Sequence, residues 1–266
     1  MAFARKCHGA IISADSMQIY RDLPIGTAQP TKEERREIPH YLVGEYDLSA
    51  PFTVYEFVRR AEAAVRDAES RGLTPILCGG TGFYLKAFFY GLDDLPGDPQ
   101  LRAELDKKYD NPAGEEALRE RMRKLDPEAL AKWCHCRRKL IRSLEVKLLT
   151  GQSVLRLQRH NRTLRFPVTA KILRRTPEEL RKRIEARTDA MLRAGWVDEA
   201  REAIAKGLFQ SPTAHQALGY SIIGEYLAGK ITREEMRNRI VTATGQYARR
   251  QRTWFRHQHP EAETEL

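Results

Sequence analysis

Residues 10–18 read Ala-Ile-Ile-Ser-Ala-Asp-Ser-Met-Gln, and this stretch decides the fold class expected for the chain. Its apolar start, residues 10–12, has the length and residue types of a buried strand. The strand ends in polar residues, and ligands of open α/β sheets bind just outside the carboxyl ends of strands. Asp15 is therefore a candidate general base. The alternative, that its side chain caps the following helical turn, stays open at this point.

Alternating strand and helix signals continue from this stretch. Thr53, with Glu56 three residues later, has the pattern of a capping box and predicts a helix that ends at Gly72. An apolar run over residues 74–78 predicts the next strand, and a helix is expected from about Thr81 to Tyr90. Strands that alternate with helices are typical of a parallel α/β sheet.

The pattern changes at residues 95–99, which read Leu-Pro-Gly-Asp-Pro. From there to about Asn161 the sequence predicts helices only, so we expect residues 96–163 to form a helical insertion domain. Residues 166–173 again have strand character, and from Pro177 we expect helices to the end of the chain. The α/β core would then comprise residues 1–95 and 164–266.

The composition favours a polyanionic partner, nucleic acid above all. The chain has 266 residues, 41% of them hydrophobic, a formal net charge of +10 and a pI of about 9.5. Its four cysteines fit no disulfide framework, and Cys134-His135-Cys136 has no second ligand pair at zinc-like spacing. We therefore expect reduced cysteines, a cytoplasmic location and no metal at this motif. No apolar run approaches membrane-spanning length.

Five blocks of sequence, taken together, resemble one known family. They are residues 11–31, with Ser-Ala-Asp-Ser-Met-Gln and Ile-Gly-Thr-Ala-Gln-Pro-Thr; 77–85, with Cys-Gly-Gly-Thr-Gly; 138–145; 216–220, Gln-Ala-Leu-Gly-Tyr; and 247–256, with Ala-Arg-Arg-Gln-Arg. Their order and joint presence over nearly the whole chain resemble the tRNA dimethylallyltransferases. The resemblance implies a P-loop-type α/β core. It also implies transfer of a dimethylallyl group from its diphosphate to N6 of the adenosine beside the tRNA anticodon.

The resemblance implies roles for residues at the catalytic end. Asp15 matches the family's general base, which accepts a proton from the adenine amine as the new bond forms. Its neighbours Ser16, Met17 and Gln18 match adenine-contacting residues. Thr81 matches a threonine that acts at the leaving diphosphate, beside the amides of the Gly-Gly turn. Arg187 matches an arginine on the donor diphosphate, although a solvated helix charge is the alternative, and Mg²⁺ is the expected cofactor.

The tRNA side of the resemblance comprises two basic runs and a polar block. The residues that it implies for tRNA contact, besides Asp15 to Gln18, are Arg102, Arg138, Lys139, Arg142, Gln216, Tyr220, Arg249 and Arg250. Basic side chains supply phosphate contacts, and aromatic residues can stack on unstacked bases. For Trp254 and Phe255 we favour core packing instead. Gly245 departs from the family, in which an arginine is common at this position.

A Gly-rich phosphate loop, G-x-x-x-x-G-K-[ST], precedes the first block in the family by about two dozen residues. Here ten residues precede Ile11, and they form no such loop. We therefore expect this chain alone to bind tRNA but to transfer little or nothing. Two rivals stay open: a tRNA-binding protein without catalysis, and a prenyltransferase that acts on free adenine nucleotides. We expect a monomer whose partners are tRNA and dimethylallyl diphosphate, with no membrane.

Overall fold

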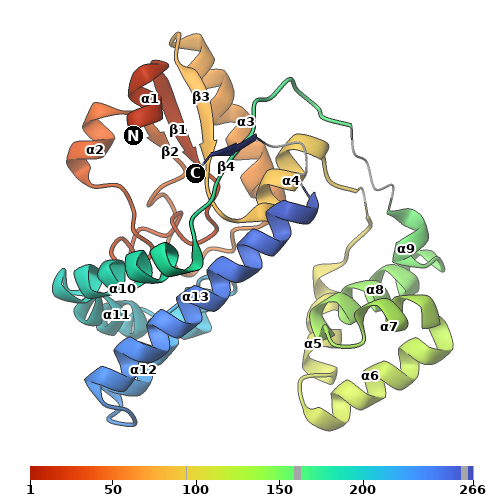
Figure 1. The fold of residues 1–266 in the computed structure, drawn as a ribbon. Helices are drawn as coiled ribbons and strands as arrows, with labels where there is room; N and C mark the ends of the chain where they lie inside the picture. The colour runs from red at the N-terminus through yellow and green to blue at the C-terminus, as the bar shows by residue number, and fades with distance from the viewer. Residues whose placement is uncertain (94, 159–162, 259–262, 266) are drawn as a thin grey trace. The chain divides into compact units, whose positions relative to one another are not determined.

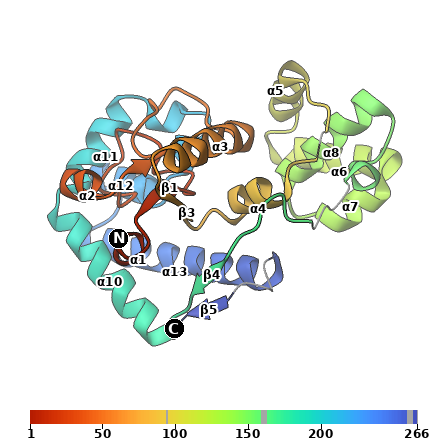
Figure 2. The ribbon, with the colours of Figure 1, turned by 90° about the horizontal axis from the view of Figure 1, so that it is seen from above.

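Parallel strands form the sheet at the centre of one part of the chain (Figures 1 and 2). The computed structural model describes residues 1–93, 95–158, 163–258 and 263–265. β1 (Gly9–Ser13) lies between β2 (His40–Tyr41) and β3 (Thr74–Cys78). The strands predicted over residues 10–12 and 74–78 are confirmed as β1 and β3, each within one residue, and the parallel α/β class is confirmed. β2 was not predicted, because two residues are too few for a periodic apolar signal.

Helices in the first 90 residues pack around this sheet. They are α1 (Ala2–Lys6), α2 (Lys32–Glu37), α3 (Val54–Ser70) and α4 (Gly82–Tyr90). α3 begins as predicted, since Thr53 Oγ1 accepts a hydrogen bond from Glu56 N over 3.2 Å. The reciprocal half of the capping box was predicted wrongly. The Glu56 carboxylate accepts from the Tyr46 hydroxyl and from Arg60 Nε instead.

A second group of helices completes the same unit. It comprises α10 (Pro177–Arg193), α11 (Trp196–Ala205), α12 (Tyr220–Leu227) and α13 (Arg233–Gln258), with 3-10 turns η1 (Leu208–Gln210) and η2 (Ala214–Gln216). α10 packs beside α13, as both views show (Figures 1 and 2). Gly195 separates α10 from α11 as predicted, with a φ of +98° that favours glycine. The shared core includes Ile12, Phe57, Tyr84 and Trp196, all buried.

Two predictions for this half of the chain were wrong. Residues 166–170 do not form a strand, and β4 covers only Lys171–Leu173. Pro167 explains the difference, because it lacks the N–H group that a strand ladder requires. The chain is also not helical to its end. β5 (Glu263–Glu265) pairs in parallel with β4.

Residues 90–163 form a second unit, whereas residues 1–89 and 164–266 form the first. Its helices are α5 (Pro99–Lys108), α6 (Pro112–Leu125), α7 (Pro127–Trp133), α8 (Arg137–Thr150) and α9 (Val154–Leu157). α5, α6 and α7 each begin with an Asp or Asn cap followed by proline, a strong helix-start signal. Buried Leu105, Leu118, Met122 and Leu140 form a core of its own. The prediction of helices alone is confirmed for the described residues of this unit.

No helix among the described residues has both the length and the apolar character needed to cross a bilayer.

Candidate active site

A cavity of about 1230 Å³ lies in the first unit, at the carboxyl ends of β1 and β3. Its lining includes Asp15, Ser16, Met17, Gln18, Gly26, Thr27, Gly79 and Gly80 from the sheet edge; Ile184, Arg187, Thr188 and Met191 from α10; Gln216 to Gly219; and Tyr247, Arg250, Gln251, Arg252 and Phe255 from α13. Five segments far apart in the sequence therefore surround one space. Asp15 is the one carboxylate among the described lining residues, and Arg187 is a positive charge that acts on it.

Asp15 caps the turn that follows β1 and also borders the cavity. Its Oδ1 accepts hydrogen bonds from Met17 N at 2.8 Å and Gln18 N at 3.3 Å. The alternative that Asp15 caps the following turn is thus correct for Oδ1, which accepts both hydrogen bonds. Burial raises the pKa of the Asp15 carboxyl above its ordinary value, whereas these two amides and the positive charge of Arg187 lower it.

Thr81 lies against the same turn. Its Oγ1 accepts a hydrogen bond from Ser16 N at 3.1 Å, and its backbone N–H donates to Ala14 O at 3.1 Å. The approach of the two turns requires glycine at position 79, because a Cβ there would lie 2.3 Å from Ala14 O. The Gly-Gly-Thr turn and the Asp-Ser turn therefore meet at one edge of the sheet, as the parallel pairing of β1 with β3 demands.

The Gln18 side chain has a different place from the one expected for an adenine contact. Its Nε2 donates to Thr27 O at 3.1 Å and to Ala28 O at 3.0 Å, and its Oε1 accepts from the Ser13 hydroxyl at 2.8 Å. The amide is thus engaged in holding residues 27 and 28 rather than free to read a base. Any contact of Gln18 with adenine stays a prediction.

Side chains of α13 close the other side of the cavity. Gln251 Nε2 donates to Gly80 O at 3.0 Å, which ties α13 to the Gly-Gly turn. Tyr247 borders the cavity, and burial together with the Asp15 charge raises the pKa of its hydroxyl. Trp254 is half-buried and packs against Gly82, and its place in the core stays a prediction. Phe255 instead lines the cavity, so the prediction that it belongs to the core was wrong.

Gln216 and Tyr220 were both expected to contact tRNA, and the structure separates them. Gln216 borders the cavity, whereas the Tyr220 side chain is completely buried. The Tyr220 hydroxyl donates to Glu199 Oε1 at 2.6 Å, and burial raises its pKa so that it stays protonated. Tyr220 is therefore a core residue, and its hydroxyl is not available to RNA. Sequence reasoning missed both Glu199 and its neighbour Trp196, because no motif marks them.

The remaining predicted RNA contacts fall into two classes. Arg138, Lys139, Arg249 and Arg250 are exposed. Arg102 and Arg142 instead form ion pairs within the protein, because both guanidinium groups lie 2.7 Å from the buried carboxylate of Glu145. Arg142 also donates to the backbone oxygens of Leu95 and Pro96. These two arginines hold the second unit together, and their contact with tRNA stays a prediction.

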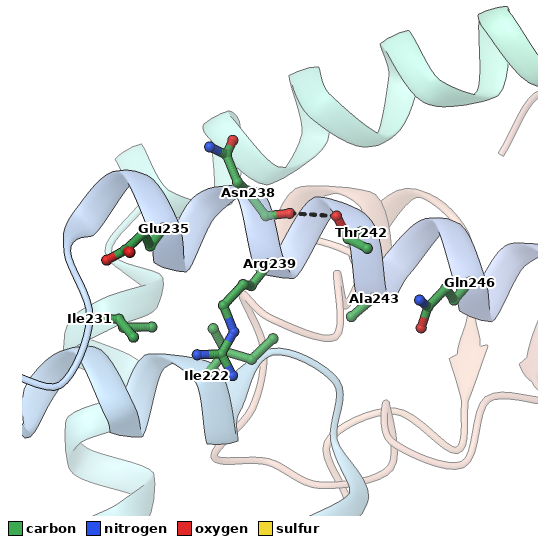
Figure 3. A pocket seen from close by; sticks show the side chains of 8 residues that line it. All are labelled: Ile222, Ile231, Glu235, Asn238, Arg239, Thr242, Ala243 and Gln246. Atoms are coloured by element: carbon green, nitrogen blue, oxygen red, sulfur yellow. Dashed lines mark hydrogen bonds between the residues drawn. The ribbon is translucent and has the colours of Figure 1, made fainter.

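A second hollow, of about 620 Å³ and wide open, lies between α12 and α13 (Figure 3). Ile222 and Ala243 line both this hollow and the larger cavity. Its polar side chains are mostly engaged: Thr242 Oγ1 donates to Asn238 O at 2.9 Å, and Arg239 pairs with Glu225 at 2.7 Å. It therefore adds no group that could take part in chemistry.

The described residues contain no group of three or more His, Cys, Asp or Glu side chains arranged to hold a metal ion. In the larger cavity the single carboxylate, Asp15, already accepts two amide hydrogen bonds. Within the described part of the chain, the side chains by themselves thus do not build a Mg²⁺ site.

Comparison with known proteins gives a consistent result. The family model described as IPP transferase matches residues 18–258. The tRNA dimethylallyltransferase 1 of Citrifermentans bemidjiense is 41% identical over 256 residues, which is 95% of this chain and 82% of that protein. The tRNA dimethylallyltransferase of Geobacter metallireducens is 39% identical, over 96% of this chain and 84% of that protein.

Solved structures agree with these sequence relatives. The full-length tRNA isopentenylpyrophosphate transferase from Bacillus halodurans is 32% identical, with a TM-score of 0.70 over 99% of this chain and 83% of that one. A eukaryotic dimethylallyltransferase acting on tRNA is 28% identical, with a TM-score of 0.78 over 95% of this chain and 65% of that one.

Proposed function

The chain belongs to the IPP transferase family, and from this premise we propose that its cavity joins a dimethylallyl group to N6 of the adenosine beside the anticodon of tRNA. The donor is dimethylallyl diphosphate. One observation carries the proposal: the Asp15 carboxylate and the Thr81 hydroxyl belong to two mutually hydrogen-bonded turns at the edge of one cavity. This arrangement supports the assignment of Asp15 as the base and of Thr81 as the leaving-group donor.

The step forms a C–N bond, breaks a C–O bond and moves one proton from nitrogen to a carboxylate oxygen. The N6 lone pair attacks the first carbon of the dimethylallyl group, and the bond from that carbon to the bridging oxygen breaks as diphosphate leaves. Asp15 takes the proton that N6 loses. Because Oδ1 holds two backbone amides, Oδ2 is the oxygen assigned to this proton.

The donor side combines cationic and apolar groups. Arg187 lines the cavity and can give two parallel hydrogen bonds to phosphate oxygens. Thr81, next to the lining residue Gly80, is assigned as the donor to the oxygen on which charge builds. Ile184 and Met191, on the same face of α10 as Arg187, offer an apolar wall for the five-carbon group. We propose that Mg²⁺ arrives with the diphosphate, whose oxygens supply most of its ligands.

The proposal for tRNA binding has two parts, phosphate contacts from basic side chains and a target adenine that leaves its stack. Arg250 and Arg252 line the cavity, and Arg249 is exposed beside them on α13. Phosphate contacts from these residues, and from Arg138 and Lys139 in the second unit, would hold the anticodon stem-loop. The target adenine must leave its stack to reach Asp15. A monomeric state and a cytoplasmic location stay predictions.

The relatives named above act on tRNA, and neither rival function gains support from them. A prenyltransferase for free adenine nucleotides would have no use for the basic face of α13. A tRNA-binding protein without catalysis would have no use for the coupled Asp15 and Thr81 turns.

A single-turnover assay tests the proposal. Because this chain alone is expected to transfer little, the parent in this assay is the chain extended at its N-terminus by the Gly-rich phosphate loop of the family. It is mixed in excess with tRNA and dimethylallyl diphosphate, and the digested nucleosides are resolved by mass spectrometry. We expect N6-(dimethylallyl)adenosine from the parent. The yield from Asp15→Asn should be lower by about a hundredfold or more. Asp47→Asn, a change at an exposed carboxylate outside the cavity, should match the parent. Equal product from the parent and Asp15→Asn, or modification at another atom, would overturn the assignment.

A further inference from the structure

The Glu199 carboxylate on α11 binds a loop that forms one wall of the cavity. Its Oε2 accepts from Ile25 N at 2.6 Å, and its Oε1 accepts from Gly26 N at 2.9 Å. The two oxygens of one side chain therefore hold two successive backbone amides, 174 and 173 residues away in sequence. Hydrogen bonds from amides to an ionised acceptor are among the stronger ones in proteins.

Buried aromatic side chains hold this carboxylate in place. The Tyr220 hydroxyl donates to Glu199 Oε1 at 2.6 Å, and Tyr220 packs edge-on against Trp196 with ring centroids 5.9 Å apart. Both rings are buried. Position 26 accepts only glycine, because a Cβ there would lie 2.1 Å from Trp196 Nε1 and 2.5 Å from the Tyr220 hydroxyl. The backbone of the loop thus rests directly on these two rings.

The loop is joined in turn to the catalytic turn. Thr27 O and Ala28 O accept from Gln18 Nε2, and Gln29 Nε2 donates back to Gln18 O at 2.9 Å. Gln18 N is one of the two amides that Asp15 Oδ1 accepts. A continuous path of hydrogen bonds therefore runs from Glu199, through residues 25–29, to Asp15.

We propose that Glu199, supported by Tyr220, is a positioning residue. It holds the loop of residues 25–29, of which Gly26 and Thr27 line the cavity, and so places the target adenine against Asp15. This inference deepens the proposed function and rests on it. Neither Glu199 nor Tyr220 touches the substrate in this assignment: Tyr220 is buried, and the Glu199 oxygens bind the backbone. Small misplacements at a reacting centre are costly, on the order of a hundredfold in rate per ångström.

Three variants separate positioning from general stability. Glu199→Gln keeps the shape of the side chain but leaves only one oxygen for two amides and a hydroxyl. Tyr220→Phe keeps the packing and removes a single hydrogen bond, so it serves as the milder variant if Glu199→Gln does not fold. The matched control is Glu202→Gln, which changes an exposed carboxylate on the same helix.

The first readout is amide hydrogen exchange in the free protein. We expect the amides of residues 25–29 to exchange about ten- to a hundredfold faster in Glu199→Gln, less so in Tyr220→Phe, and unchanged in Glu202→Gln. Exchange in the β1 and β3 amides should stay as in the parent. Equal exchange of residues 25–29 in parent and Glu199→Gln, or a uniform rise over the whole unit, would overturn the positioning role.

The second readout is the preference of the protein for an anticodon stem-loop with adenosine over one with guanosine at the target position. We expect Glu199→Gln to lower this preference about tenfold or more, with little change in affinity for the guanosine stem-loop. An unchanged preference would overturn the inference. A parent without any preference would contradict the proposed function instead, and the exchange data would still report on the loop.

Discussion

The hydroxyl oxygen of Thr81 lies 3.1 Å from the backbone nitrogen of Ser16, 65 residues earlier in the chain, and accepts its hydrogen bond. This contact joins the turn that ends β3 to the turn that ends β1. Neither turn alone encloses a site. Their contact brings the candidate base and the candidate leaving-group donor to the same edge, because β1 and β3 are adjacent parallel strands.

Replacement of the Thr81 hydroxyl should reduce transfer more than it reduces binding. Thr81→Val preserves the shape but removes both the acceptor for Ser16 N and the donor proposed for diphosphate. We expect single-turnover transfer to fall by roughly a hundredfold, the usual scale for loss of one such donor. Thr81→Ser, which restores the hydroxyl, should stay within a few-fold of the parent. Unimpaired transfer by Thr81→Val would remove Thr81 from the site.

Asp15→Asn should make the protein more stable at neutral pH. Burial raises the folded-state pKa of Asp15, so folding favours the protonated form. Stability therefore falls as the pH rises from the ordinary Asp pKa through the folded-state pKa, and the whole loss is present above it. Asparagine keeps an oxygen for the Met17 and Gln18 amides without the charge. Thermal unfolding of both proteins from pH 8 down to pH 4 should show a higher Tm for the variant. The difference in Tm between variant and parent should become smaller as the pH falls. A lower Tm for Asp15→Asn at pH 8 would contradict this account.

The pH dependence of transfer should report the Asp15 carboxylate. Transfer needs the ionised form, so the rate should fall at acid pH with a midpoint above the ordinary Asp value of about 3.9. Arg187 lowers this pKa, so Arg187→Gln should move the midpoint to higher pH, in addition to any loss of rate. Arg181→Gln changes an exposed arginine of the same helix, paired with Glu185, and should leave the midpoint in place. The full pH–rate profile distinguishes a moved midpoint from a merely lower rate.

Binding of tRNA should weaken linearly on logarithmic axes as salt rises, by about 0.7 to 0.9 per phosphate contact. Arg249→Gln should reduce the slope by about one unit and weaken binding to all tRNA sequences alike. Arg59→Gln, at an exposed arginine of α3 paired with Glu56, is the matched control and should leave the slope unchanged. A salt-independent affinity of the parent would show that the net charge of +10 has no part in RNA binding.

Substitution of Arg142 should act first on stability. Glu145 is fully buried and accepts from both Arg102 and Arg142, so Arg142→Gln leaves a buried carboxylate with one partner fewer. We expect the second unit to unfold at a lower temperature and the first unit to be unchanged. Hydrogen exchange of the α5 and α8 amides measures this effect. Arg138→Gln, at an exposed position of α8, should lower tRNA affinity without this loss. An unaltered second unit in Arg142→Gln would assign Arg142 to RNA rather than to structure.

The elements that sequence predicted well carry local signals. β1 and β3 are apolar runs, α3 has a capping threonine and a buried face at helical spacing, and α5 to α7 begin with a cap and a proline. β2 is too short for such a signal. β4 is the last part of the strand predicted over residues 166–173. β5 was not predicted, because it depends on pairing with β4, 92 residues earlier in the chain.

The sequence by itself determined which chemical groups stand at the ends of β1 and β3 and that the chain belongs with the relatives that share them. Only the tertiary structure decided what those groups do. The Gln18 side-chain amide donates to Thr27 O and Ala28 O, and the buried Tyr220 hydroxyl donates to Glu199, although the motifs placed both residues among the RNA contacts. The physical reason is that a polar side chain is satisfied by whichever donor or acceptor folding brings near it, and that partner is rarely a sequence neighbour.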